Sequence, residues 1–340
     1  MNFLNETRLA NYTTMHLGGP AKVIAEAYSE QDIIDAVAYA AANGLTLLVI
    51  GQGSNIIFGD NGFDGLVLIN KIGGLLIDSQ TGIVRVGAGT NWHDVVIQTV
   101  QNGLVGIEAM ALIPGTSGAT PINNVGAYGQ DISGVLVSVQ AFDTQTKRFV
   151  ELTNADCTFS YRNSILKSEL YGRYIISSVT LQLKKADTTY HAPKYPALQA
   201  ELARREIIYP TPEQVMQAVI AIRTVKLPDP RLISNTGSFF KNPIVTKEKA
   251  LALTQAFPTL PHYPQANGSE KLAAGWLIEA VGLKGHKERG IAVYDKQALV
   301  LVNENARSFA DLKNMIDKVQ TTVLTQFGVT LEPEPEIFAA

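Results

Sequence analysis

Glycines that directly follow short apolar runs are the feature that most constrains this chain. Glycine reaches backbone conformations that other residues avoid, and it lets a ligand approach the main chain closely. Repeated use of such glycines in the first 130 residues predicts several loops that converge on one large ligand. The groups are Gly18-Gly19, Gly51 with Gly53, Gly87 with Gly89, and four glycines between residues 115 and 129.

The first candidate loop is Gly51-Gln52-Gly53-Ser54-Asn55, which follows the apolar run 45–50, an expected buried strand. Consecutive backbone N–H groups in such a turn can bind phosphate oxygens, and Ser54 and Asn55 add side-chain donors. Ile56 stands where Gly-x-Gly-x-x-Gly requires its last glycine, so the dinucleotide fingerprint is absent. Taken alone, the loop is equally consistent with a tight turn that binds nothing.

The longest expected loop covers residues 111–129 and combines four glycines with two prolines and four hydroxyl-bearing residues. Prolines hold the backbone in place, while glycines permit close approach. Long loops inside compact domains are usually functional or disordered, and the apolar content of this one argues against disorder. We therefore expect it to line a flat aromatic ligand with its amides.

Composition narrows the class of protein. A chain of 340 residues with 46% hydrophobic and 17% charged residues can pack two or three domains. The net charge of -3, without a basic stripe, disfavours a nucleic-acid partner. Cys157 is the sole cysteine, so it cannot form an internal disulfide. With no apolar signal segment in residues 1–11 and no apolar run near ~18 residues, we expect a cytoplasmic protein without membrane insertion.

Secondary structure is expected to mix helices and strands. Capping patterns predict helices over 29–43 and 308–327, Pro212 begins another helix, and 92–101 is a fourth. Alternating or apolar runs predict strands at 45–50, 83–86, 135–142 and 174–183. The segment 226–230 interrupts regular structure and is a candidate domain junction.

Three polar residues are candidates for chemistry. Ser238 stands in Gly-Ser-Phe-Phe-Lys-Asn-Pro, which lacks the Gly-x-Ser-x-Gly pattern of a hydrolase, so its hydroxyl could instead give a proton to a carbanion. Arg162 lies among aromatic and apolar residues and suits a carboxylate substrate. Glu334 belongs to a proline-rich acidic tail that would have to return to the site. A turn, a salt bridge and a solvated tail are the structural alternatives.

The ordered set of these motifs resembles the UDP-N-acetylenolpyruvoylglucosamine reductase family, in its longer-loop branch, over essentially the whole chain. The resemblance implies an α+β fold. A two-part FAD-binding region of the vanillyl-alcohol-oxidase/PCMH type would be joined to a separate α+β substrate-binding domain. The implied domains are 1–70, to which the tail 328–340 returns, then 71–222, and the substrate-binding domain 223–327.

The same resemblance implies the reaction. NADPH would reduce non-covalently bound FAD, and UDP-N-acetylglucosamine enolpyruvate would then be reduced to UDP-N-acetylmuramate for peptidoglycan synthesis. Ser238 would be the proton donor, while Arg162 and Glu334 would stabilise the enol-like intermediate. Substrate contacts carried over by motif are Lys226, Asn242, Tyr263, Gln297 and Tyr195. The partners would be small molecules, with no metal, and the protein would be a monomer.

The resemblance also implies the cofactor contacts. They are Gly51, Gln52, Gly53, Ser54, Asn55, Ile113, Pro114, Gly115, Thr116, Ser117, Gly118, Asn123, Gly126 and Tyr128. Pro335 departs from the usual pattern after Glu334 and leaves the reach of that carboxylate open. Two alternatives stay open: an FAD-dependent alcohol oxidase of the same superfamily, and a flavin or nucleotide-sugar binding module without catalysis.

Overall fold

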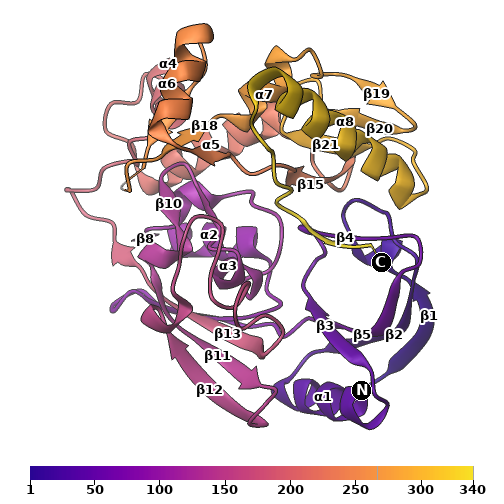
Figure 1. Cartoon of the computed structure of the whole chain (residues 1–340). Coiled ribbons are helices and arrows are strands. Elements are labelled where there is room, and N and C mark those ends of the chain that lie inside the picture. Colours follow the sequence, from indigo (N-terminus) through magenta and orange to yellow (C-terminus); the bar gives the residue numbers. More distant parts are fainter. Residues whose placement is uncertain (266, 340) are drawn as a thin grey trace. The chain divides into compact units, whose positions relative to one another are not determined.

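The structure is a computed structural model that describes residues 1–265 and 267–339. Contacts divide the chain into two compact units (Figure 1). The first unit comprises Met1–Thr7, Ala21–Gln52 and Asp64–Thr224. The second comprises Arg8–Pro20, Gly53–Phe63 and Val225–Ala340, so both units are assembled from separate stretches of chain.

A four-stranded sheet forms one part of the first unit. Its order is β1-β2-β5-β3, with β1 (Phe3–Arg8), β2 (Pro20–Ala27), β5 (Phe63–Asn70) and β3 (Thr46–Ile50). Helix α1 (Glu30–Ala42) buries Ile33 and Val37 against Leu66 and Leu68 of β5. Ser29 caps the helix, and the Asp32 side chain accepts from the Ser29 N–H in return, as the sequence predicted.

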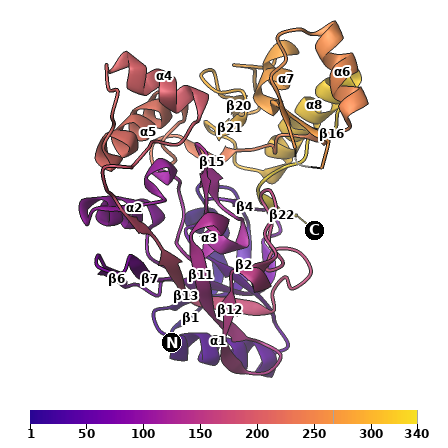
Figure 2. The same cartoon turned by 90° about the vertical axis from the view of Figure 1, so that its left-hand side faces the viewer.

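A five-stranded antiparallel sheet forms the other part, in the order β12-β11-β13-β7-β6. The strands are β6 (Leu75–Asp78), β7 (Ile83–Gly87), β11 (Leu136–Asp143), β12 (Arg148–Thr153) and β13 (Tyr174–Gln182). One apolar core joins this sheet to α2 (Trp92–Gln101), α4 (Pro196–Arg204) and α5 (Pro212–Lys226). Helices α4 and α5 lie next to each other in Figure 2 and contribute to the same core.

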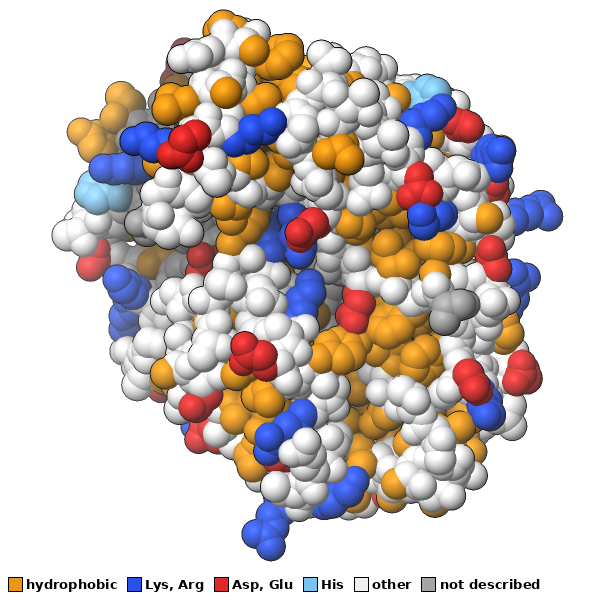
Figure 3. Space-filling view, in the orientation of Figure 1, with side chains coloured by type: hydrophobic (Ala, Val, Ile, Leu, Met, Phe, Trp, Pro, Cys, Tyr) orange, Lys and Arg blue, Asp and Glu red, His pale blue; other side chains and the backbone are white. Residues whose placement is uncertain are grey.

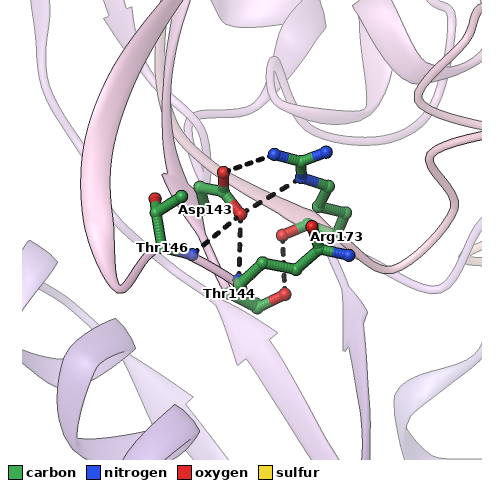
Figure 4. A network of polar contacts seen from close by, with 5 residues as sticks. Asp143, Thr144, Thr146 and Arg173 are labelled. Carbon is green, nitrogen blue, oxygen red and sulfur yellow. Dashed lines mark hydrogen bonds and ion pairs between the residues drawn. The ribbon is translucent and has the colours of Figure 1, made fainter.

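An ion pair joins buried Asp143, at the end of β11, to partly exposed Arg173, the residue before β13 (Figure 4). Asp143 is 2% exposed, and Arg173 donates to its two oxygens from Nε at 3.2 Å and from a terminal nitrogen at 2.8 Å. The N–H groups of Gln145 and Thr146 also donate to Asp143. The guanidinium, the largest influence, holds the pKa of this carboxyl far below its ordinary value.

The second unit contains two small sheets with helices packed on them. One has the order β15-β21-β20-β19, with β15 (Ser234–Ser238), β21 (Val300–Asn303), β20 (Ile291–Val293) and β19 (Lys287–Glu288). The other is β16-β18-β17, with β16 (Ile244–Val245), β18 (Glu270–Leu272) and β17 (His262–Pro264). The helices are α6 (Lys247–Ala256), α7 (Ala274–Ala280) and α8 (Phe309–Phe327).

Early and late parts of the chain meet inside this second unit. Strand β22 (Glu336–Phe338) pairs in parallel with β4 (Ile56–Phe58). Met15 and Ile57 join the core that α8 builds with Phe239 and Leu277. The tail therefore returns to the N-terminal part of the chain, up to the last described residue.

Several short elements complete the chain. They are β8 (Leu104–Val105), α3 (Ala119–Ile122), β9 (Gly126–Ala127), β10 (Gln130–Asp131), β14 (Lys184–Lys185) and four 3₁₀ turns at Leu9–Tyr12, Glu108–Met110, Ile132–Gly134 and Ala155–Cys157. The segment 111–129, expected as one loop, thus contains a helical turn. Pro121 is tolerated there because it lies in the first turn, where its missing N–H has no helical partner.

The expected long elements are present within one or two residues of their predicted ends. On the face that Figure 3 shows, basic and acidic side chains are interspersed among uncharged ones, in keeping with the small net charge. Among the described residues, no helix is both long and apolar enough to cross a membrane. No cluster of potential metal ligands is found within 1–265 and 267–339.

Candidate cofactor and substrate sites

Three glycine loops of the first unit come together. A Cβ added at Gly51 would lie 2.3 Å from Thr116 Oγ1, which places the 51–55 turn directly on the longest loop. Gly118 donates its N–H to Ala88 O at 2.8 Å and leaves no room for a side chain there. Gly89 is equally close to the backbone of Lys71. The predicted convergence of glycine loops is therefore present in the fold.

These loops carry N–H groups that suit an anionic ligand such as the diphosphate of FAD. Among the described residues, no backbone carbonyl accepts a hydrogen bond from the N–H of Gln52, Gly115 or Thr116. Gly115 and Thr116 are buried, whereas Gln52 is exposed. Buried N–H groups normally have a partner, and phosphate oxygens supply one. The residues present thus fit FAD. At Gly51 the two loops approach each other without room for a side chain, and both loops carry N–H groups without a backbone partner among the described residues.

Other predicted cofactor residues have structural contacts as well. Ser117 is fully buried and donates its hydroxyl to Thr90 O at 3.1 Å. Asn123 accepts from the Lys167 ammonium at 2.7 Å. Gly126 O accepts from Arg162 at 2.8 Å. Ile113 and Pro114 directly precede Gly115 in this loop. The N–H of Trp92 donates to Gly115 O at 3.1 Å and so holds the loop at that point.

The remaining half of the 51–55 turn belongs to the second unit. Gly53 has a left-handed φ of +64°, and a Cβ there would lie 2.0 Å from Tyr12 O, so this position requires glycine. Asn55 Nδ2 donates to Glu334 O at 3.5 Å, and Glu336 N–H donates to Asn55 O at 3.0 Å. Ser54 lies between Gly53 and Asn55 in the turn. The turn and the acidic tail are thus in direct contact.

Two arginines and three tyrosines make contacts with one another in the first unit. Arg162 has a left-handed φ of 54° and lies over the Tyr161 ring at 5.4 Å. Tyr128, in the longest loop, packs edge-on against Tyr195 with ring centroids 5.2 Å apart. Burial raises the pKa of the Tyr128 phenol, and the charge of Arg223 opposes that rise. The Tyr195 ring therefore lies beside the predicted cofactor loop.

Arg223 is the residue of this cluster that sequence reasoning missed. Its Nε is buried without a hydrogen-bond partner among the described residues, and a terminal nitrogen donates to Leu112 O at 3.3 Å. Burial lowers the pKa of Arg223, contact with Tyr128 opposes this, and the positive charge of Arg162 adds to the lowering. The sequence does contain a sign that Arg223 faces inward, because position 223 lies on the same helical face of α5 as the buried residues Met216 and Val219.

The second unit brings Ser238 and Glu334 together. Ser238 ends β15 and is half-buried, and the next residue, Phe239, donates its N–H to Leu299 O at 2.7 Å. Glu334 N–H donates to Phe239 O at 2.8 Å, and Lys241 N–H donates to Glu332 O at 2.9 Å. The tail therefore runs alongside 239–241, and Pro335 does not prevent Glu334 from reaching the neighbourhood of Ser238.

The predicted substrate contacts are distributed over this unit and the end of α5. Asn242 accepts from Ala274 N–H at 3.0 Å and so caps α7, while Gln297 accepts from Leu299 N–H at 3.3 Å beside the Ser238 strand. Tyr263 is 48% exposed on β17 and lies below the Lys271 ammonium. Lys226 is exposed at the last position of α5.

One pocket of the first unit lies apart from the predicted contacts. Its volume is ≈ 550 Å³, and its walls include Tyr190, Lys194, Leu202 and Tyr209. None of the predicted cofactor or substrate residues of the described chain lines it. We assign it no role in the reaction.

Taken together, glycine loops with free amides and an α+β fold define a flavin-binding oxidoreductase. Residues 21–148 match the FAD binding domain family, and residues 229–338 match the family described as UDP-N-acetylenolpyruvoylglucosamine reductase, C-terminal domain. The chain belongs to the UDP-N-acetylenolpyruvoylglucosamine reductase family. Both the α+β class and the FAD cofactor that the sequence predicted are thereby confirmed.

Relatives match along almost the full chain. The UDP-N-acetylenolpyruvoylglucosamine reductase of Ralstonia nicotianae is 44% identical over 97% of this chain and 97% of its own length. The Escherichia coli protein of the same name is 42% identical over 98% of this chain and 96% of its own. The crystal structure of the Thermus caldophilus reductase has a TM-score of 0.68 at 22% identity, covering 99% and 98% of the two chains, and supports the fold.

Proposed function

We propose that this chain reduces UDP-N-acetylglucosamine enolpyruvate to UDP-N-acetylmuramate with NADPH, as a step of peptidoglycan synthesis. The observation that carries the proposal is the backbone contact that brings Ser238 and Glu334 together, next to the turn that contains Asn55. A binding module without catalysis has no need of a hydroxyl and a carboxylate held together in this way. An alcohol oxidase would need a base that accepts a proton instead of a hydroxyl that gives one.

In the proposed reaction, Ser238, Arg162 and Glu334 would each have a separate role. FAD, which the loops around Gly51 and Gly115 would hold, would supply the chemistry of hydride transfer from the nicotinamide to the enolpyruvyl methylene carbon. Ser238 then gives its hydroxyl proton to the adjacent carbon, which bears the carboxylate, so one hydride and one proton add across the double bond. Arg162 and Glu334 stabilise the enol-like form that exists between these two transfers.

Electrostatics support these roles. A cation fixed before the reaction stabilises charge that appears only during it, without the cost of reorienting solvent. Arg162 is such a cation, since its hydrogen bond to Gly126 O and its contact with the Tyr161 ring fix its position. Lys226, Asn242, Tyr263, Gln297 and Tyr195 would bind the nucleotide-sugar, and the three-domain division 1–70, 71–222 and 223–327 would separate cofactor and substrate binding.

A visible absorption spectrum under anaerobic conditions tests the proposal. We expect a flavin band that NADPH bleaches and that UDP-N-acetylglucosamine enolpyruvate restores. Bleaching without recovery would remove this substrate, and oxygen consumption with an alcohol would favour the oxidase. We also propose that the protein is cytoplasmic and a monomer. Gel filtration of the purified protein tests the monomer, for which a single peak near the 36.7 kDa of one chain is expected.

A further inference from the structure

Strand β15, which ends at Ser238, has an irregular register between Asn235 and Ser238. On β15, Asn235 pairs with Val302 and Ser238 pairs with Val300, so Thr236 and Gly237 together face the single residue between those two valines. Two residues opposite one constitute a β-bulge, and bulges turn the following side chain to the other face of the sheet. Gly237 has a left-handed φ of +73°, which few other residues adopt.

The bulge decides which way Ser238 faces. Without the bulge, position 238 would pair with Leu299, the residue before β21, and would lie on the opposite face. With it, Ser238 shares a face with Val300, whereas Phe239 enters the large apolar core. The hydroxyl is therefore kept out of that core by a single extra residue in the strand.

Asn235 holds this bulge in shape. Its side chain is 2% exposed, and its Oδ1 accepts from the Gly237 N–H at 2.8 Å. Its Nδ2 donates to Ile233 O at 2.7 Å and to Pro228 O at 3.2 Å. All three of these hydrogen bonds go to the backbone of β15 and of the segment that precedes it, so both N–H groups of this amide are engaged in holding the backbone.

The same residue connects the bulge to the predicted cofactor turn. Asn235 N–H donates to Thr14 O at 3.0 Å, and Thr14 N–H donates to Gly53 O at 3.1 Å. A chain of hydrogen bonds therefore runs from Gly53 through Thr14 and Asn235 to the residue that precedes Ser238. All of its members belong to the second unit.

We propose that Asn235 and Gly237 are positioning residues, which set the Ser238 hydroxyl for proton transfer through the bulge. The proposal rests on the proposed function, because it gives Ser238 the role of proton donor. Neither residue touches substrate; each acts through the backbone that carries Ser238.

The test measures the two half-reactions separately in the FAD-loaded enzyme. In Asn235→Ala we expect NADPH to bleach the flavin at the wild-type rate, while recovery with UDP-N-acetylglucosamine enolpyruvate slows by about 10²-fold, the usual effect of a misplaced reacting group. Adding Asn235→Ala to Ser238→Ala should slow recovery little further, because residues that act as a unit are not additive.

Gly237→Ala provides a second variant in case the first does not fold. A Cβ at Gly237 meets nothing within 4 Å, so the substitution strains only the backbone. Gly282→Ala is its matched control, since Gly282 has φ +76° and equally open space on an exposed turn after α7. We expect slow recovery in Gly237→Ala, wild-type recovery in Gly282→Ala, and similar melting temperatures for the two.

The product offers a further readout that a loss of stability would not change. In D₂O the wild-type enzyme should place deuterium at the carboxylate-bearing carbon in one configuration, and Asn235→Ala should give a mixture, seen by NMR. If Ser238→Ala recovers at the wild-type rate and still places deuterium in one configuration, the proposed function of Ser238 as proton donor fails. If Ser238→Ala is slow but Asn235→Ala and Gly237→Ala match Gly282→Ala, the positioning role is overturned.

Discussion

At the scale of single residues, we expect replacement of Arg223 to affect FAD binding more than the stability of the protein. Its Nε is buried without a partner, and the structure gives it no carboxylate among the described residues. A buried cation without a counter-ion costs free energy, so Arg223→Met should change the free energy of unfolding of the FAD-free protein by no more than about 1 kcal/mol. FAD binding should weaken by about 10- to 100-fold, because a charged hydrogen bond is lost.

Fluorescence titration with FAD and chemical denaturation measure these two effects. Arg204→Met is the control, since the Arg204 side chain is 70% exposed on α4 and pairs with Glu201. An unchanged FAD affinity in Arg223→Met would show that the buried guanidinium does not face the cofactor.

The sequence reveals residues whose role depends on local pattern, and misses those whose role depends on distant partners. Glycines after apolar runs and the motif around Ser238 are visible because the chemistry lies within a few consecutive positions. Asn235 is not visible in this way, since its function depends on Thr14, more than 200 positions earlier. Arg223 shows itself in the sequence only as a polar interruption of an apolar stripe.

At the scale of elements, the Asp143–Arg173 pair predicts a pH-dependent stability. A carboxyl whose pKa is lowered by folding contributes stability above its ordinary pKa, and this stability is lost as the pH falls through the lowered value. Asp143→Asn should therefore lower the free energy of unfolding by about 1–2 kcal/mol at neutral pH, because solvent reaches the Arg173 side chain and screens part of the attraction. The difference from wild type should shrink below pH of about 4, where the unfolded carboxyl takes up its proton.

Urea denaturation at several pH values measures this difference. Asp64→Asn is the matched control, because Asp64 is 89% exposed in its ion pair with Lys22 and should contribute less than about 1 kcal/mol. Equal losses in the two variants, or a loss that does not depend on pH, would contradict a stabilising role for the Asp143–Arg173 pair.

Elements with their own local signals are predictable, whereas those defined by a distant strand are not. Helices α1 and α8 carry Ser caps and an apolar stripe, which specify their starts and buried faces without reference to the rest of the chain. Strands such as β4 and β22 contain three residues each and exist because they pair with each other across about 280 positions. No periodicity can develop over so short a stretch.

At the scale of the whole chain, the units are interleaved in a way that composition cannot reveal. Residues 8–20 and 53–63 belong to the unit built by the C-terminal part, while 21–52 belong to the other. The boundary near Thr224 falls inside α5, close to the break that the sequence shows at 226–230. The division into three domains by function remains a prediction, since contacts group residues by packing and not by the ligand they bind.

Cofactor removal should lower the stability of the protein, because the predicted FAD site consists of loops and not of core. Gly51, Gly115 and Gly118 contribute little apolar surface, and the amides of Gln52 and Thr116 have no backbone partner until a ligand arrives. A ligand that binds the folded chain alone adds RT ln(1 + [L]/Kd), or about 2.7 kcal/mol at a hundredfold excess over Kd. The melting temperature should therefore rise with the logarithm of FAD concentration.

Riboflavin separates the contribution of the ring from that of the rest of FAD. It keeps the isoalloxazine but lacks the diphosphate and the adenosine, so it cannot use the free amides of these loops, and at equal concentration it should raise the melting temperature much less than FAD. Equal shifts for the two would show that the glycine loops do not hold the diphosphate, and no shift with FAD would remove them from the cofactor site altogether. A larger shift with FAD is the outcome that the amides of Gln52, Gly115 and Thr116 predict, because these N–H groups have no backbone partner among the described residues.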